Sequence, residues 1–288
     1  MIRILPNGGT VYTTSPSPTH DREKRGKTQG WSRAVSRRNT DFLMSVEVGS
    51  LSGFGFALSL TVRECPVSPA AWASVRKRFF ERLRSAGMIR AHWLTEWQRR
   101  QVPHMHSAVW FSRSVDLAWL KRQWIESASE FRPASVGQHV VPIEGIVGWF
   151  EYLAKHASRS ISNYQRSKSL VPASWAGSTG RMWGYLGAWV VSEEKCPEVP
   201  VRAELHYRRL LLRYQIGKAR RQGDRRRVVY LRRYLSAWRG FSDRDFTSER
   251  VCLPRFWISE EDQWSLLACA LRSHGDPEPS RRGVSDPQ

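Results

Sequence analysis

The segment from Trp93 to Phe111 constrains the fold most, because apolar and polar residues alternate in it on both sides of a basic turn. This alternation predicts two β-strands joined as a hairpin, since successive side chains of a strand point to opposite faces. His104 and His106 would then share one face, while Met105 between them would point to the other. The segment therefore predicts an antiparallel pair of strands that carries two imidazoles on the same face.

A single carboxylate, Glu96, lies on the first of these strands. If the turn is centred near Arg100, Glu96 stands directly opposite His104, and directly opposed residues of an antiparallel pair share a face. Two imidazoles and one carboxylate leave coordination positions open, which suits a catalytic divalent cation. Non-haem iron oxygenases and zinc hydrolases use the same ligand types, so the ligands alone do not choose the reaction.

The charge of the chain narrows the choice of substrate. The 288 residues include 46 Lys and Arg against 26 Asp and Glu, a formal net charge of +20. Such an excess opposes a compact fold unless a polyanion is the partner, and nucleic acid is the commonest one. No apolar run approaches the roughly 20 residues of a membrane span, and the first residues lack a signal-peptide core. Four scattered cysteines fit a reducing compartment. We therefore expect a DNA-binding protein of the cytoplasm, with no membrane association.

Composition and periodicity divide the chain into regions. Residues 1–40 are rich in Ser, Thr, Pro and basic residues without a hydrophobic period, which predicts a flexible basic arm. Further on, strands are expected at 41–48, 56–62 and 138–143, and amphipathic helices at 69–83 and 116–130. Residues 196–272 are expected to form a basic helical region, whose almost single-signed charge favours phosphate contact, and residues 273–288 a disordered tail.

A helix expected over residues 146–157 places Tyr152 on a face with Lys155, His156 and Arg159. On this pattern alone, Tyr152 could also be an ordinary half-buried packing residue. A tyrosine oxygen can serve as a covalent nucleophile, but free tyrosine titrates near ~10, so it needs help. Lys155 and a metal-bound phosphate are the available helpers, because a metal polarises phosphoryl oxygens. Together these parts describe a metal-assisted enzyme that cuts DNA and keeps one end.

Several basic and aromatic residues are expected to contact the DNA. Arg99 and Arg100 lie in the turn of the hairpin, and Arg159 lies on the tyrosine face. Arg181 and Trp183 belong to a glycine-punctuated aromatic stretch and could stack on a base, although Trp183 could equally belong to the core.

Two motifs in this order resemble those of the HUH (His-hydrophobe-His) endonucleases. They are the segment 95–106, which contains Glu96 and the histidine pair, and the segment 152–156, about forty residues later. More narrowly, the chain resembles the rolling-circle replication initiators of filamentous phages and small plasmids. The strand 56–61 and the segment 180–184 are similar to further motifs of that family. The resemblance extends over about residues 42–191.

The resemblance implies an α+β fold with a central five-stranded antiparallel sheet and flanking helices, in a nuclease domain spanning residues 41–195. It implies nicking at an origin, a 5′-phosphotyrosyl intermediate, a free 3′-OH and later rejoining of the displaced strand. By position, His104 and His106 match the metal-binding pair, Glu96 the third ligand, Tyr152 the nucleophile and Lys155 the lysine that follows it.

The expected cofactor is Mg²⁺ or Mn²⁺, and the expected partners are single-stranded or supercoiled origin DNA, with a host helicase and polymerase. His156 stands where the family often has a second tyrosine, which favours a single-tyrosine enzyme. Tyr164 lies twelve positions beyond Tyr152, and whether it serves a second transfer is left open.

Alternative functions remain at this point. A transposase of the same chemistry would act on hairpin ends, whereas a relaxase would normally carry a third metal-binding histidine and often a helicase. A non-catalytic DNA-binding protein or repressor, acting through the basic C-terminal helices, belongs to a different class. The charge disfavours an iron oxygenase.

Overall fold

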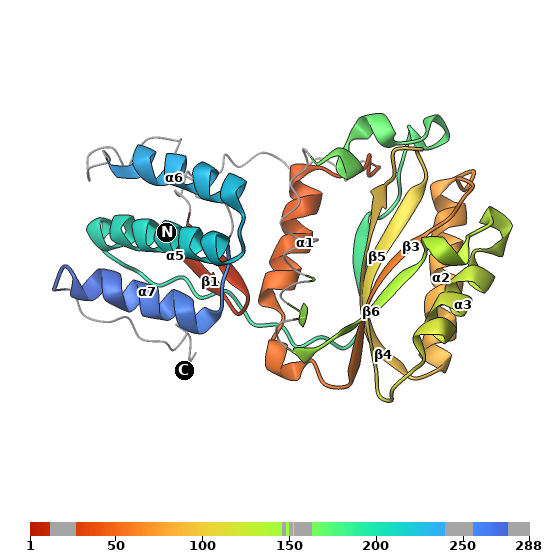
Figure 1. Cartoon of the computed structure of the whole chain (residues 1–288), viewed down its shortest axis with the longest axis horizontal. Helices are drawn as coiled ribbons and strands as arrows, with labels where there is room; N and C mark the ends of the chain where they lie inside the picture. Colours follow the sequence, from red (N-terminus) through yellow and green to blue (C-terminus); the bar gives the residue numbers. More distant parts are fainter. Residues whose placement is uncertain (12–26, 146–147, 150–151, 153–162, 240–255, 276–288) are drawn as a thin grey trace. The chain divides into compact units, whose positions relative to one another are not determined.

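The computed structural model describes residues 1–11, 27–145, 148–149, 152, 163–239 and 256–275. The chain divides into two compact units (Figure 1), one formed by residues 1–20 with 192–288 and the other by residues 21–191. Within the described residues, no helix is long and apolar enough to cross a membrane.

A five-stranded antiparallel sheet forms the centre of the larger unit, as the resemblance implied. Its strands are β3 (Phe54–Thr61), β4 (Met88–Trp97), β5 (Pro103–Phe111), β6 (His139–Ile143) and β7 (Trp183–Gly187). They lie in the order β6-β3-β5-β4-β7, and every neighbouring pair is antiparallel. The strand with the two histidines, β5, is therefore central, and the α+β class is confirmed.

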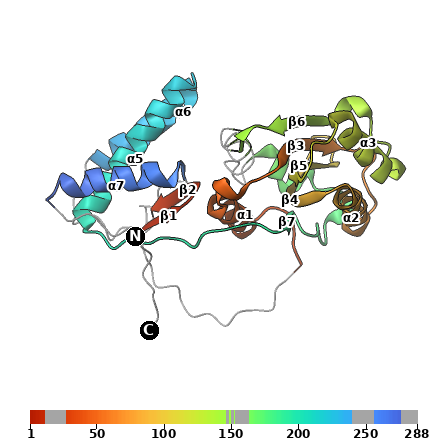
Figure 2. The same cartoon turned by 90° about the horizontal axis from the view of Figure 1, so that it is seen from below.

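Helices α2 (Pro69–Ser85) and α3 (Leu117–Ser127) cover one face of this sheet (Figures 1 and 2). Both begin where the sequence provides a cap: the Ser68 side chain accepts a hydrogen bond from the first turn of α2, and the Asp116 side chain does the same for α3. Their apolar faces bury large side chains against the sheet, and the Trp124 indole donates a hydrogen bond to the carbonyl of Thr61 at 3.0 Å. This face is the main hydrophobic core.

Helix α1 (Arg33–Ser45) lies on the opposite face of the sheet (Figure 1). The strand expected at 41–48 is therefore wrong over most of its length. Val35, Asn39 and Leu43 are buried at helical spacing, but the polar Asn39 interrupts the apolar stripe. The apolar run that remains, around residues 42–44, is equally compatible with a strand. Ser32 caps the helix by accepting a hydrogen bond from the Val35 amide at 3.2 Å.

Over its described residues, the smaller unit contains a three-stranded sheet and three helices. They are β1 (Ile2–Leu5), β2 (Gly8–Val11), β8 (Phe256–Trp257), α5 (Val201–Arg221), α6 (Arg225–Arg239) and α7 (Glu260–Arg272). The sheet order is β1-β2-β8, so strands from the two ends of the chain pair with each other. The basic region expected to be helical therefore holds α5 to α7 and also one strand.

The expectation that residues 1–40 form a flexible arm is wrong for the part that the structure describes. Ile2 and Ile4 are fully buried in the hydrophobic core of the smaller unit. Strands of four residues are too short to show a hydrophobic period, and Gly8 pairs with Trp257, which is remote in the sequence. No local pattern could reveal that pairing.

Candidate active site

The register of the hairpin between β4 and β5 places Glu96 directly opposite His104, as the sequence predicted. His106 stands opposite Leu94, so the two histidines and Glu96 share one face of the sheet. The imidazole centroids of His104 and His106 are 4.3 Å apart, with the rings edge to face at 83°. Glu96 is fully buried and His106 is nearly so. The structure therefore places the three predicted metal ligands on one face of the sheet.

Two neighbouring side chains orient this cluster. Ser59 Oγ lies 2.9 Å from His106 Nδ1, which directs the other ring nitrogen, Nε2, towards Glu96 Oε2 at 3.5 Å. Arg166 Nε donates to the second carboxylate oxygen, Oε1, at 2.7 Å. The Arg166 guanidinium also lies 4.0 Å from the centroid of the Trp31 ring, and its side chain is buried. The two oxygens of Glu96 thus have different partners.

The spacing of these donors suits a divalent cation in part. Mg²⁺ takes near-ideal octahedral geometry with ligands at about 2.1 Å, so two adjacent ligands are roughly 3.0 Å apart. The distance between His106 Nε2 and Glu96 Oε2 is 3.5 Å. The other carboxylate oxygen, Oε1, accepts a hydrogen bond from Arg166. His104 Nδ1 lies 3.4 Å from Gln98 Nε2. Among the residues that the structure describes, no group of three or more His, Cys, Asp or Glu side chains is arranged to hold a metal. The three side chains therefore share a face without forming a complete metal site in this structure.

Tyr152 is buried and its hydroxyl belongs to a chain of hydrogen bonds. The hydroxyl oxygen lies 3.0 Å from His92 Nδ1, and His92 Nε2 lies 2.8 Å from Asn39 Oδ1. Because an amide oxygen only accepts, Nε2 carries the proton of the neutral ring and Nδ1 accepts from the tyrosine. Trp149 stacks on the Tyr152 ring with a centroid distance of 5.7 Å. Tyr152 is thus the donor at the start of a buried Tyr–His–Asn chain.

Burial keeps both rings of this chain neutral. It raises the pKa of Tyr152 far above its ordinary value, and the charge of Glu96 raises that pKa further. Burial also lowers the pKa of His92 to about 3. His92 precedes Glu96 by four residues on β4, which is about 13 Å along the strand and on the same face. In this structure the phenol is therefore protonated and held by a hydrogen bond to His92. Lys155, His156 and Arg159 lie outside the described residues.

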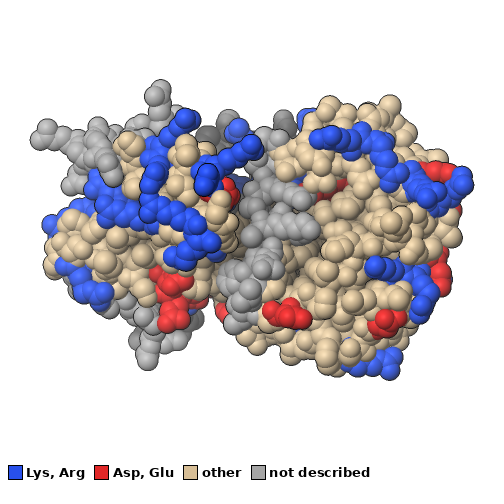
Figure 3. All heavy atoms as spheres, viewed as in Figure 1, with Lys and Arg blue, Asp and Glu red and all other residues tan. Residues whose placement is uncertain are grey.

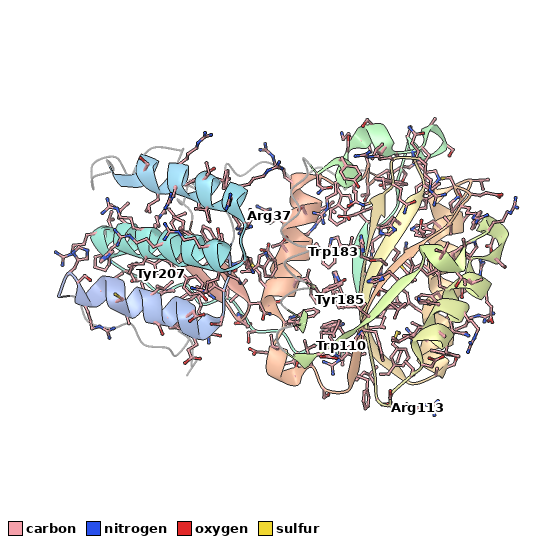
Figure 4. The ribbon with its side chains drawn as sticks, in the orientation of Figure 1. Arg37, Trp110, Arg113, Trp183, Tyr185 and Tyr207 are labelled. Carbon is pink, nitrogen blue, oxygen red and sulfur yellow. The ribbon has the colours of Figure 1, made fainter. Side chains whose placement is uncertain are left out.

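A cavity of about 800 Å³ adjoins the edge strand β7 and contains Arg38, Arg181, Trp183 and Tyr185 in its lining. Trp183 and Tyr185 pair with Leu94 and His92 of β4, so they share the face of the histidine pair. In Figure 4 both aromatic residues lie between α1 and the sheet. The predicted DNA contacts Arg181 and Trp183 are thus in one cavity, joined by a second arginine and a second aromatic ring.

The two arginines of the hairpin turn have different surroundings. Arg99 is exposed, and its guanidinium lies 5.4 Å from the centroid of the Tyr164 ring. Arg100 donates to the carbonyls of Val62 and Arg63 and so ties the turn to the end of β3. Arg100 therefore has a structural role in addition to the DNA contact predicted for it.

Sequence reasoning missed several members of this site. They are Asn39, Ser59, His92 and Arg166 around the two clusters, and Arg38 and Tyr185 in the cavity. His92 carried a usable signal, because it lies four residues before Glu96 and so on the same face of a strand. Asn39 and Arg166 carried none, because their positions depend on segments remote in the sequence.

A five-stranded antiparallel sheet with a histidine pair on its central strand, a carboxylate opposite and a tyrosine over the same face defines the HUH class of proteins. A family model of replication-associated proteins of the ORF2 type matches residues 55–161. The chain is 36% identical over 279 residues to a replication-associated protein of Pseudomonas phage Pf3, covering 95% of this chain and 98% of that protein. It is also 43% identical over 243 residues to a putative replication protein of Xylella fastidiosa (strain 9a5c), covering 82% of this chain and 86% of the relative.

The chain therefore belongs to this family of replication-associated proteins. No solved structure matches it significantly.

Proposed function

We propose that the chain is a rolling-circle replication initiator that nicks origin DNA through a phosphotyrosine intermediate and later rejoins the displaced strand. The observation that carries this proposal is the placement of Tyr152 over the face of the sheet that holds Glu96, His104 and His106. Membership of a family of replication-associated proteins supports DNA as the substrate.

Each group has a distinct role in the proposed reaction. The Tyr152 oxygen forms a bond to phosphorus while the bond between phosphorus and the 3′ oxygen breaks, which leaves a phosphotyrosine and a free 3′-OH. The tyrosine proton passes to water, because a pKa of about 3 makes His92 too weak a base to keep it, and the 3′ oxygen takes up a proton from water. Attack of a 3′-OH on the phosphotyrosine reverses these steps and rejoins the strand.

His104, His106 and Glu96 would hold the Mg²⁺ or Mn²⁺ that the proposal requires. The chemistry that such an ion supplies when bound is polarisation of a phosphoryl oxygen. Arg166 and Ser59 act on the ligands rather than on the DNA, because each fixes one donor side chain by a hydrogen bond. Lys155 is proposed to assist Tyr152.

The cavity beside β7 is the proposed path of the single strand. Trp183 and Tyr185 offer aromatic faces to bases, and Arg38 and Arg181 offer guanidinium groups to phosphates. Arg99 at the turn and Arg159 complete the proposed DNA contacts. A host helicase and polymerase would then extend the free 3′-OH.

The test is formation of a covalent adduct. The full chain, incubated with single-stranded origin DNA and Mg²⁺ or Mn²⁺, should give a species that migrates slowly on a denaturing gel. Tyr152→Phe should abolish it, whereas Tyr164→Phe, which changes an exposed tyrosine of the same unit, should not. An adduct that still forms with Tyr152→Phe would show that Tyr152 is not the nucleophile.

A non-catalytic DNA-binding protein is the second candidate. The observation that favours it is the enclosed state of the phenol, whose pKa burial raises and whose hydroxyl donates to His92. That candidate predicts tight DNA binding unaffected by metal, with no nicking of a supercoiled plasmid.

A further inference from the structure

A groove of about 470 Å³ lies between α5 and α6 in the smaller unit. Three arginines and a serine line it together with two aliphatic residues, namely Arg213, Ile216, Arg220, Arg232, Leu235 and Ser236. Arginine presents five N–H donors in a rigid fork that matches phosphate oxygens, and a serine hydroxyl is a further donor. Among the described residues, the lining contains no carboxylate and no aromatic ring.

The helix geometry explains why these side chains converge. Arg213 and Arg220 are seven residues apart on α5, which places them on one face about 10.5 Å apart along the axis. Arg232 reaches the same groove from α6. Ile216 and Leu235 are buried and hold the two helices together at the floor of the groove. The aliphatic stems of the arginines can pack beside this floor and leave their heads in water.

Three described carboxylates of this unit have partners outside the groove. Glu204 binds Arg208, Glu194 binds Arg3, and Asp262 accepts a hydrogen bond from Tyr214. Within the described parts of the chain, no ion pair joins a carboxylate to Arg213, Arg220 or Arg232. Figure 3 shows Lys and Arg gathered over α5 and α6 on this face of the unit. As far as the structure describes the chain, the groove is therefore a concentration of positive charge without an internal counter-charge.

We propose that this groove is a second DNA-binding site, which takes the backbone phosphates of double-stranded DNA. The absence of an aromatic ring among the described lining residues argues for duplex, because proteins hold single strands by stacking their bases on aromatic side chains. Guanidinium contacts to phosphates suit a duplex, whose bases are already stacked on each other. The cavity beside β7 has the opposite character, since Trp183 and Tyr185 line it.

This assignment deepens the proposed function by giving the two units different forms of DNA. It rests on that function only in taking DNA as the substrate. Contacts of this kind are independent of base sequence, so the groove would hold the flanking duplex while the larger unit acts on the strand to be cut.

The test compares two triple variants of the full chain in which the same charge is removed. One is Arg213→Gln with Arg220→Gln and Arg232→Gln. The control is Arg221→Gln with Arg226→Gln and Arg233→Gln, which changes exposed arginines of the same helices that do not line the groove. Circular dichroism of both proteins reports whether α5 and α6 are retained. If the glutamine variant unfolds, a third variant with lysine at the three groove positions keeps the positive charge.

Fluorescence anisotropy with a labelled duplex of about 30 base pairs, without metal, gives affinity as a function of salt. The groove variant should bind at least about tenfold more weakly, and its plot of log K against log salt should be shallower by about 2 to 3. The control should change affinity less than about threefold. Equal losses in the two triple variants would overturn the proposal, as would equal losses of single-strand and duplex affinity in the groove variant. The measurement involves no cleavage, so its outcome is separable from that of the nicking proposal.

Discussion

Glu96 and Arg166 form a buried ion pair on which the geometry of the site depends. Both side chains are almost fully buried, and Nε lies 2.7 Å from Oε1. Removing one partner of such a pair leaves an uncompensated buried charge, which costs about 3 to 5 kcal/mol. Arg166→Met should therefore lower the free energy of unfolding by roughly that amount in urea denaturation.

Arg82→Met is the matched control, because Arg82 forms an exposed ion pair with Glu126. Exposed pairs contribute about 0 to 1 kcal/mol, so this variant should lose little. Similar losses in the two variants would show that Arg166 does not stabilise the site in the way proposed.

His92 should make the stability of the larger unit depend on pH. Its pKa is about 3 in the folded chain, whereas a histidine of the unfolded chain titrates near 6.5. Between these values the unfolded state binds more protons, so the free energy of unfolding falls as the pH is lowered. The contribution of His92 to the free energy of unfolding is fully present above about pH 6.5. It decreases by up to about 1.4 kcal/mol per pH unit as the pH is lowered from there towards 3.

His92→Gln should flatten the slope of unfolding free energy against pH between about 6.5 and 4. His139→Gln, at an exposed histidine of β6, should leave the slope unchanged. Denaturant titrations at several pH values give both slopes. A wild-type slope that His92→Gln does not alter would contradict the burial of a neutral imidazole at this position.

At the scale of elements, the turn of the β4–β5 hairpin contains one residue in an unfavourable conformation. Gln101 has a φ of 59°, in the left-handed region that favours glycine. Gln101→Gly should therefore leave the unfolding free energy unchanged or raise it by about 0.5 to 1 kcal/mol. Gln98→Gly, at the start of the same turn and without this strain, should lower it. Urea denaturation of the two variants checks the prediction, which fails if both substitutions destabilise equally.

The same hairpin shows what sequence reasoning can achieve. Alternation of apolar residues specified both strands, and a turn near Arg100 specified the register that sets Glu96 against His104. Helix α2 was predicted closely, because Ser68, Pro69 and Gly87 mark its ends. Helix α1 was mistaken for a strand over its C-terminal part, because its buried face includes Asn39 and Thr40, which carry no apolar signal. Asn39 is buried and accepts a hydrogen bond from His92. This contact joins segments remote in the sequence, so no local pattern reveals it.

At the scale of the whole molecule, the two ends of the chain contribute to one unit. Ile4 on β1 is fully buried among residues of α5 and α7. Ile4→Ala should lower the free energy of unfolding of this unit by about 2 to 5 kcal/mol, because it removes buried methyl groups and leaves a cavity. Val229→Ala, at an exposed position of α6, should change it by less than about 0.5 kcal/mol. Hydrogen exchange in α5 and α7 reports the difference, and unchanged protection in Ile4→Ala would show that β1 is dispensable.

Arginine side chains line a cavity in each of the two units. The larger unit holds the histidine pair, the Tyr–His–Asn chain and an aromatic cavity, whereas the smaller unit holds a groove of arginines. The net charge of +20 predicted nucleic acid as the partner, but it could not indicate which residues of each unit gather at one place. The arrangement of these residues depends on strand and helix pairings between segments that are remote in the sequence.

The central claim is that Tyr152 attacks a DNA phosphate, and mapping the covalent adduct tests it most directly. The full chain would be reacted with single-stranded origin DNA and Mg²⁺ or Mn²⁺, digested with nuclease and protease, and examined by mass spectrometry for a peptide that carries a nucleotide. The account predicts a phosphodiester on the oxygen of Tyr152, with a free 3′-OH on the released fragment. A nucleotide on Tyr164 or on any other residue, or cleavage without a covalent peptide, would contradict it.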